Sequence, residues 1–233
     1  MELIDEISIV FPCDTNRVPL FLNTLAKYQE FGIPKKVEII VVSRTFTELV
    51  IPGVDIKVVH YKHDGEFFCP SLAFNLGVKA AKYKNIIVGH PEVKPLNDVL
   101  SLLFKSKRRN YVCRVLDLNE NGERTGVLFG TGHREEWIGL YFLACYKRED
   151  IEAINGWDMR FMDGYANEDI DFGQRLLNAK KPCIIRDDIM GEHQWHSRKV
   201  YEGSTKEWQF NRDLFNENKT NCVGYVENGL KEC

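Results

Sequence analysis

The chain has no excess of positive charge, because its 31 lysine and arginine residues are outnumbered by 34 acidic ones and the formal net charge is -3. Proteins that hold nucleic acid by its phosphates need a basic surface, so this balance argues against a nucleic-acid partner. The sequence also lacks an apolar run long enough to cross a bilayer, and it does not open with the charged and apolar regions of a secretory signal. We therefore expect a soluble, cytoplasmic protein.

Cysteine is present, but not in an arrangement that builds a framework. The seven residues are odd in number, widely spread and free of any Cys-x-x-Cys pair. This pattern excludes a dense disulfide scaffold and a zinc knuckle, and it favours reduced thiols. Internal repeats and low-complexity segments are missing as well. A chain of 233 residues with 44% hydrophobic content then predicts one globular domain.

Strand and helix patterns alternate in the first half of the chain. Short apolar or β-branched runs predict strands, and helical spacing between them predicts helices at 19–31 and 71–83. The strands are expected at 7–11, 37–42, 56–60, 86–88, 111–116, 138–146 and 183–185. A Gly-rich stretch at 121–132 is interpreted as a lid that orders on ligand binding, and an amphipathic helix is expected at 204–218. This order predicts an α/β protein with a mixed, mainly parallel sheet flanked by helices and a ligand site at the carboxyl ends of its strands.

The segment 154–177 is the most informative part of the sequence. An aromatic, glycine-containing loop leads directly into Asn167-Glu168-Asp169, which begins a helical pattern. Asn167 is predicted to cap this helix, and Asp171 is predicted to pair with Arg175 one turn later. The acids either simply start the helix well or line a site beside the loop. At a helix N-terminus we expect a carboxylate to keep a low pKa.

Two short motifs in this segment resemble a known family. Gly-Trp-Asp-x-x-Phe, followed by Gly-Tyr-x-x-Glu-Asp-x-Asp-x-x-x-Arg-Leu, resembles the acceptor-side motif of inverting glycosyltransferases with the GT-A fold, of the family 2-like and galactosyltransferase C-terminal-domain type. The resemblance implies that Asp169 is the general base and that Glu168 binds or orients the acceptor sugar. A sugar hydroxyl is a poor nucleophile until a positioned carboxylate takes its proton. Trp157 and Tyr165 would offer flat ring faces to the acceptor.

The first half of the chain resembles the nucleotide-sugar half of the same enzymes. The loop after the first strand implies donor contacts from Pro12, Asp14 and Asn16. The segment Pro70-Ser-Leu-Ala-Phe-Asn-Leu-Gly77 resembles the family's Ala-x-Asn-x-Gly segment, through which Asn75 would meet the donor. The second strand ends in Arg44, where the family places an acid that reads uracil. A UDP-sugar is favoured as donor, and the identity of the base stays open.

The triplet His90-Pro91-Glu92 stands where the family has Asp-x-Asp, whose carboxylates bind a divalent cation. Nitrogen and oxygen ligands at the same spacing imply a metal held by His90 and Glu92, with His90 also facing the donor. His193 is the third ligand that the resemblance implies, and His196 is the second choice. Imidazole favours manganese over magnesium. The other interpretation is that the site has degenerated and that His90 is an ordinary loop residue.

These expectations define one domain in which residues 1–95 bind the nucleotide-sugar, 96–218 bind the acceptor and carry catalysis, and 219–233 form a tail. The predicted function is transfer of a sugar from a nucleotide-diphosphate donor to a hydroxyl of a glycan or other acceptor, with inversion. Two alternatives stay open. One is a catalytically silent glycan- or nucleotide-binding protein on the same fold. The other is a sugar nucleotidyltransferase, which would want a Gly-rich basic phosphate loop after the first strand.

Overall fold

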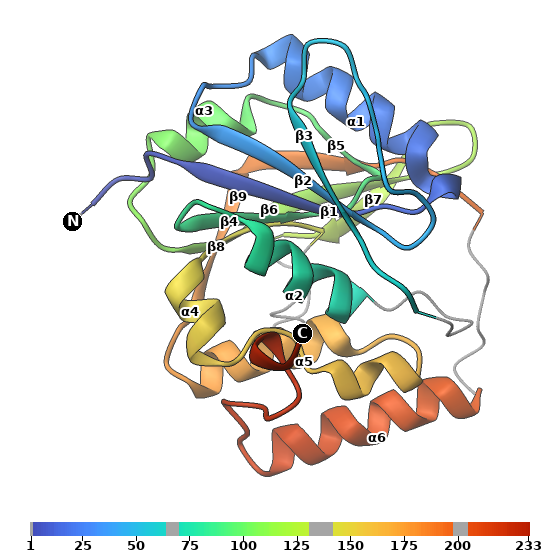
Figure 1. The fold of residues 1–233 in the computed structure, drawn as a ribbon, viewed down its shortest axis with the longest axis vertical. Coiled ribbons are helices and arrows are strands. Elements are labelled where there is room, and N and C mark those ends of the chain that lie inside the picture. Colours follow the sequence, from blue (N-terminus) through green and yellow to red (C-terminus); the bar gives the residue numbers. More distant parts are fainter. Residues whose placement is uncertain (1, 64–69, 131–141, 198–204) are drawn as a thin grey trace.

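A computed structural model describes residues 2–63, 70–130, 142–197 and 205–233. A mixed sheet crosses the molecule with helices on both faces (Figure 1). Its strands are β1 (Ile7–Pro12), β2 (Val37–Ser43), β3 (Ile56–His60), β4 (Asn85–Gly89), β5 (Val93–Pro95), β6 (Asn110–Leu118), β7 (Arg124–Phe129), β8 (Leu143–Lys147) and β9 (Cys183–His193). The helices are α1 (Val18–Phe31), α2 (Pro70–Ala80), α3 (Val99–Phe104), α4 (Arg148–Ala153), α5 (Glu168–Asn178) and α6 (Lys206–Thr220). In the described part of the chain, no helix is long and apolar enough to span a bilayer.

The sheet has the strand order β3-β2-β1-β4-β8-β6-β9-β5, and β7 pairs with β6 beside this path. The strands of the first half, β1 to β4, are mutually parallel. Antiparallel pairing enters with β8, which lies between β4 and β6, whereas β9 again runs parallel to β6. The predicted α/β class with a mixed sheet flanked by helices is confirmed. The parallel first half brings the carboxyl ends of β1, β2 and β4 to one edge.

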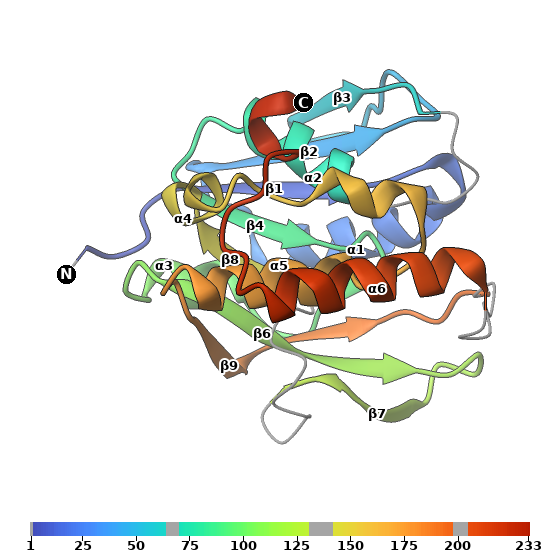
Figure 2. The same ribbon diagram turned by 90° about the horizontal axis from the view of Figure 1, so that it is seen from below.

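Both faces of the sheet are buried, which explains why its strands read as continuous apolar runs. Ile9 and Phe11 of β1 face the layer that contains α1 and α3. Val10, between them, belongs to the cluster that contains apolar residues of α2 and α5. Figure 2, seen from below, shows α6 in front of α5, and Leu214 and Phe215 of α6 pack with Phe161 and Ile170. The alternation along one strand therefore supports two separate hydrophobic cores.

The stretch interpreted as a lid is mainly a β-hairpin, so that expectation is wrong up to residue 130. Thr125, Val127 and Phe129 alternate along β7, which pairs antiparallel with β6. The side chain of Asn119 fixes the connecting turn, because its Oδ1 accepts the backbone N–H groups of Asn121 and Glu123 at 3.0 and 2.9 Å. Residues 131–132, and the first part of the strand expected at 138–146, lie outside the described residues.

The C-terminal segment is packed onto the domain rather than extending from it as a tail. Asn155, which is fully buried with φ 60, donates from Nδ2 to the carbonyl of Val226 at 2.8 Å. Its Oδ1 accepts the backbone N–H of Lys231 at 2.9 Å, and Leu230 joins the core beside α2. One buried asparagine thus fixes the segment against the loop that precedes α5.

Candidate active site

A cavity of about 510 Å³ opens at the carboxyl ends of β1, β2 and β4. The loop after each strand contributes to its wall, and the start of α5 contributes from the second half of the chain. The lining residues are Pro12, Asp14, Thr15, Asn16, Arg17, Arg44, Thr45, Pro70, His90, Pro91, Glu92 and Glu168. Six residues that the sequence nominated separately, Pro12, Asp14, Asn16, His90, Glu92 and Glu168, are therefore brought to one hollow.

Three imidazoles surround the carboxylate of Glu92. Its Oε1 lies 3.6 Å from Nδ1 of His90, 3.7 Å from Nε2 of His196 and 3.9 Å from Nε2 of His193. Burial alone would raise the pKa of Glu92, but the neighbouring imidazoles of His196 and His90 outweigh it and hold that pKa well below its usual range. The site therefore offers a buried negative charge among nitrogen donors.

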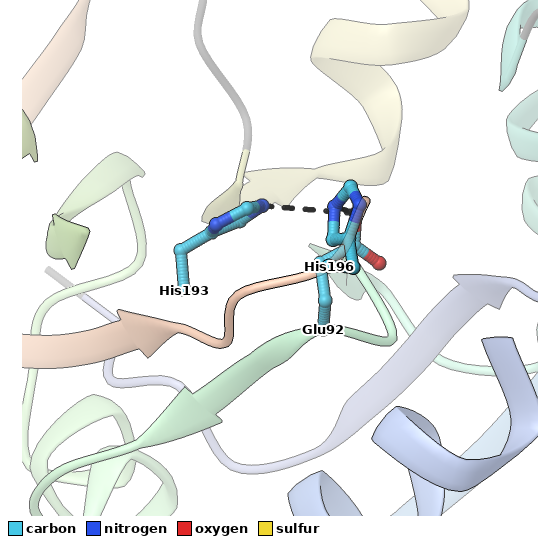
Figure 3. A group of neighbouring side chains, drawn as sticks. All are labelled: Glu92, His193 and His196. Atoms are coloured by element: carbon cyan, nitrogen blue, oxygen red, sulfur yellow. Dashed lines mark ion pairs between the residues drawn. The ribbon is translucent and has the colours of Figure 1, made fainter. Parts of the chain in front are cut away.

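The chemistry of this donor set fits a divalent cation. One ligand atom each from Glu92, His193 and His196 can be chosen so that all lie within 4.8 Å of one another, and Figure 3 shows the three side chains converging. Two atoms that bind one ion at about 2.0–2.2 Å stand roughly 3 Å apart. The separations from Oε1 of Glu92, 3.7 Å to His196 and 3.9 Å to His193, are wider than this by less than an ångström, so these side chains would have to close around a bound ion. His90 lies beside the group without belonging to it.

Gln194, which lies between His193 and His196 in the sequence, connects their segment to the backbone of Glu92. Its Nε2 donates to the carbonyl of Leu20 at 3.1 Å, to Oγ1 of Thr24 at 3.0 Å and to the carbonyl of Glu92 at 3.2 Å. Its backbone N–H also donates to the carbonyl of Glu92 at 2.9 Å. The segment between the two histidines is thereby fixed to α1 and to the backbone of the carboxylate.

The start of α5 differs from the predicted cap. Asn167 is the N-cap residue of α5, as predicted, but its backbone is left-handed, φ 68, and its side chain makes no capping hydrogen bond. Ala166 before it also has a positive φ of 62. Two such residues in succession are costly unless their surroundings hold them. Nδ2 of the buried Asn211 in α6 does so, donating to the carbonyls of Ala166 and Phe161 at 2.8 and 3.0 Å.

The two carboxyls after this turn do not keep a low pKa, and that expectation is wrong. Burial, together with repulsion from Asp169, raises the pKa of Glu168 to about 8. Burial also raises the pKa of Asp169 to about 6, against the opposing hydrogen bond from the backbone N–H of Ile170. Removal from water outweighs the favourable field of the helix N-terminus.

The raised pKa of Glu168 predicts a pH-dependent stability. The pKa of Glu168 in the folded state, about 8, lies above its pKa in the unfolded chain. The contribution of Glu168 to the free energy of unfolding is therefore fully present below about pH 4.3 and is lost as pH rises through about 8. In Glu168→Gln this loss is absent. Chemical denaturation with chelator, from about pH 5 to 8.5, should show the free energy of unfolding of wild type falling relative to the variant. Glu120→Gln, an exposed turn position, controls for the loss of one negative charge. Parallel curves for wild type and Glu168→Gln would contradict the prediction.

Two residues nominated for ligand contact are structural. Trp157 is fully buried and stacks on Phe172 with ring centroids 4.0 Å apart and planes at 4°. It cannot present a face to a sugar. Asn75 is fully buried too: its Nδ2 donates to the carbonyl of Trp157 at 2.8 Å, and its Oδ1 accepts the N–H of Trp157 at 2.9 Å. The assigned roles of Trp157 and Asn75 are therefore corrected, because together they join α2 to the loop before α5. Tyr165 is half-buried, and its backbone N–H donates to the backbone carbonyl of Glu207 at 3.1 Å.

The remaining polar residues of the acceptor-side motif form a buried network. Nε of Arg175 donates to Oδ2 of Asp171 at 2.6 Å, as the spacing predicted, and its Nη1 donates to the carbonyls of Ile154 and Gly156. Nδ2 of Asn218 in α6 donates to Oδ1 of Asp171 at 2.8 Å. The motif thus has two parts: Asp171 and Arg175 hold the framework, whereas Glu168 faces the cavity.

Two cationic residues of the cavity were not nominated. Arg44 donates from Nε to Oδ2 of Asp14 at 2.7 Å and from its backbone N–H to Oδ1 at 3.1 Å. Arg17 lines the same cavity and makes no ion pair within the described ranges. Arg44 directly follows β2 and Arg17 lies in the segment between β1 and α1, at the edge where ligands bind in parallel sheets, which is the sequence signal that could have found them.

Comparisons with known proteins bear on the fold. No protein-family model matches the sequence, and no curated protein matches it either. Among solved structures, S. aureus TarS in complex with UDP-GlcNAc matches with a TM-score of 0.67 and 11% identity, over 94% of this chain and 69% of that one. The catalytic domain of Drosophila β1,4-galactosyltransferase 7 with xylobiose matches with a TM-score of 0.63 and 16% identity, over 98% and 84%.

The mannosyltransferase PcManGT from Pyrobaculum calidifontis, in complex with GDP-Man and Mn²⁺, matches with a TM-score of 0.56 and 14% identity, over 92% of this chain and 64% of that one. The chain spans 41% of one TarS structure and 60% of a shorter one. The architecture is that of GT-A glycosyltransferases, which confirms the predicted fold.

Proposed function

We infer that this chain is a metal-dependent glycosyltransferase that moves a sugar from a nucleotide-diphosphate donor to a hydroxyl, with inversion at the anomeric carbon. One observation carries the proposal: Glu168, from the Gly-Tyr-x-x-Glu-Asp motif, and the His90-Glu92 cluster line the same cavity. Sugar transfer requires the residues that bind the acceptor to lie next to those that bind the donor. Here two distant parts of the sequence supply these two sets of residues. The Mn²⁺ complex of a protein with this fold supports the metal.

Asp169 is assigned as the general base. Its pKa of about 6 leaves it ionised at neutral pH, while making it a stronger base than an ordinary aspartate. Glu168, with a pKa of about 8, is mainly protonated there, so it can donate a hydrogen bond to an acceptor oxygen. Two adjacent carboxyls with pKa values moved apart can thus divide the roles of base and donor.

The donor's diphosphate is assigned to the cationic side of the cavity. Arg17 and the Asp14–Arg44 pair lie on the loops after β1 and β2, where a nucleotide meets the edge of a parallel sheet. Glu92, His193 and His196 would hold the divalent cation, which when bound neutralises charge on the departing diphosphate. A hydroxyl acceptor then approaches from the side of α5, where Asp169 takes its proton and the half-buried Tyr165 can contact the sugar.

Calorimetry tests the donor part of this proposal. UDP and GDP are titrated into the protein with Mn²⁺ and, separately, with chelator. At least one nucleotide is expected to bind, with an affinity that depends on the metal. Glu92→Gln should lose the metal dependence because it removes the only carboxylate of the cluster, whereas Glu48→Gln, an exposed matched variant, should keep it.

The outcomes separate the alternatives that the sequence left open. Binding of neither nucleotide under any condition would refute the transferase. Binding of glycan without metal-dependent nucleotide binding would support a catalytically silent protein on the same fold. Metal-dependent binding of one nucleoside diphosphate supports the proposal and identifies the base of the donor.

A further inference from the structure

His193 has a second contact, on the side of its ring away from Glu92. Its Nδ1 lies 3.0 Å from Oδ1 of Asp117, while its Nε2 lies 3.9 Å from Oε1 of Glu92. The two ring nitrogens therefore face two carboxylates. His193 is buried, with 3% of its surface exposed, so the ring has little freedom to turn.

The sheet brings Asp117 to this position. Asp117 is the next-to-last residue of β6, and it is the partner of His193 in the parallel pairing of β6 with β9. Paired residues on neighbouring strands project to the same face, within reach of a short side chain. A register shift between Cys113 and Arg114 of β6 precedes the contact and sets which residue meets the histidine.

We propose that Asp117 is a positioning residue that prepares His193 to bind the cation. A carboxylate accepts hydrogen bonds but does not donate them, so the contact places the imidazole proton on Nδ1. The lone pair is then on Nε2, which faces Glu92. A metal-bound histidine needs this lone pair, and a carboxylate behind the ring both fixes the tautomer and makes the nitrogen more basic. This inference rests on the proposed function for its metal site.

The ion pairs of the neighbouring residue Glu192 lie on the opposite face of β9. Glu192, one residue before His193, pairs with Lys94 at 3.1 Å and Arg124 at 3.2 Å. Successive side chains of a strand point to opposite faces, so this cluster lies on the other side of β9 from Asp117. The Asp117–His193 contact is thus separate from the charge network that joins β5, β7 and β9.

The test measures Mn²⁺ affinity by calorimetry, without nucleotide, in the full chain. Asp117→Ala should bind Mn²⁺ roughly 10–100-fold more weakly than wild type. Asp117→Leu, which nearly keeps the size of the side chain but cannot accept a hydrogen bond, decides by the same criterion if the alanine variant does not fold. Asp188→Asn is the matched control, because Asp188 lies on the same strand outside the metal group and pairs with Arg186 on the surface.

A second readout responds only to the proposed role. In ¹⁵N-labelled protein with chelator, the imidazole shifts of His193 should report protonated Nδ1 in wild type and a change towards protonated Nε2 in Asp117→Ala. If wild type binds Mn²⁺ and both variants at position 117 bind equally well, the role of Asp117 is refuted and the proposed function stands. If wild type binds no Mn²⁺, the metal site itself fails, and this inference fails with it.

Discussion

Asp169→Asn is expected to lower kcat by about 10²–10⁴-fold, because asparagine cannot take a proton from the acceptor hydroxyl. Binding of the donor should be unchanged, since the Glu92 cluster and the strand-end loops that hold it remain intact. The measurement is release of nucleoside diphosphate from the nucleotide-sugar with acceptor present, together with the affinity for UDP or GDP. In wild type, kcat should also rise as pH increases through about 6, as the base ionises.

The matched control for this experiment is Asp163→Asn, an exposed acid in the same loop, which should keep wild-type turnover. Glu168→Gln gives a second comparison, because glutamine can still donate a hydrogen bond to the acceptor and should retain more activity than Asp169→Asn. Unchanged turnover in Asp169→Asn would remove the base assignment. A loss of nucleotide affinity equal to the loss of kcat would instead indicate damage to the donor site.

Arg175→Met is expected to lower the free energy of unfolding by about 3–5 kcal/mol, because it leaves the buried Asp171 without its cation. It also removes the donor to the carbonyls of Ile154 and Gly156, which shape the loop before α5. For a chain of this size, the melting temperature should fall by roughly 6–20 °C. Chemical denaturation and calorimetry measure the two quantities.

Arg124→Met is the matched control, since its side chain is 60% exposed and its pair with Glu192 is backed by Lys94. Its effect should stay within about 1 kcal/mol. The double variant Asp171→Asn with Arg175→Met should recover part of the loss, because the uncompensated charge is gone. If Arg175→Met were no more damaging than Arg124→Met, the buried network could not be what holds the motif's framework.

Local patterns were enough to predict much of the fold. The apolar runs of β1, β2 and β4 predicted the parallel half because a strand buried on both faces needs apolar residues at nearly every position. Spacing also predicted the Asp171–Arg175 pair, since residues four apart meet on any helix. The prediction of a lid was wrong because it rested on glycine content, whereas the alternation of Thr125, Val127 and Phe129 is typical of a strand.

The resemblance nominated residues but could not divide them into those that face a ligand and those that are buried. Trp157 and Asn75 look like contact residues in sequence, yet both lie in the core, where the side chain of Asn75 hydrogen-bonds to the backbone N–H and carbonyl of Trp157. Exposure depends on which elements pack together, and here the packing of α2 against the loop before α5 decided it. The pKa values of Glu168 and Asp169 failed for the same reason, because burial is a property of the tertiary structure.

By itself, the sequence determined the order of strands and helices, the acids that begin α5 and the His90-Pro91-Glu92 triplet, because each depends on neighbours a few residues away. Only the tertiary structure decided that Glu92, His193 and His196 converge, that Asp117 stands behind His193, and that Glu168 shares a cavity with His90. These contacts join residues 76 to more than 100 positions apart, Asp117 with His193 and Glu92 with His196 among them. Sheet register and helix packing set such distances, and no local pattern encodes them.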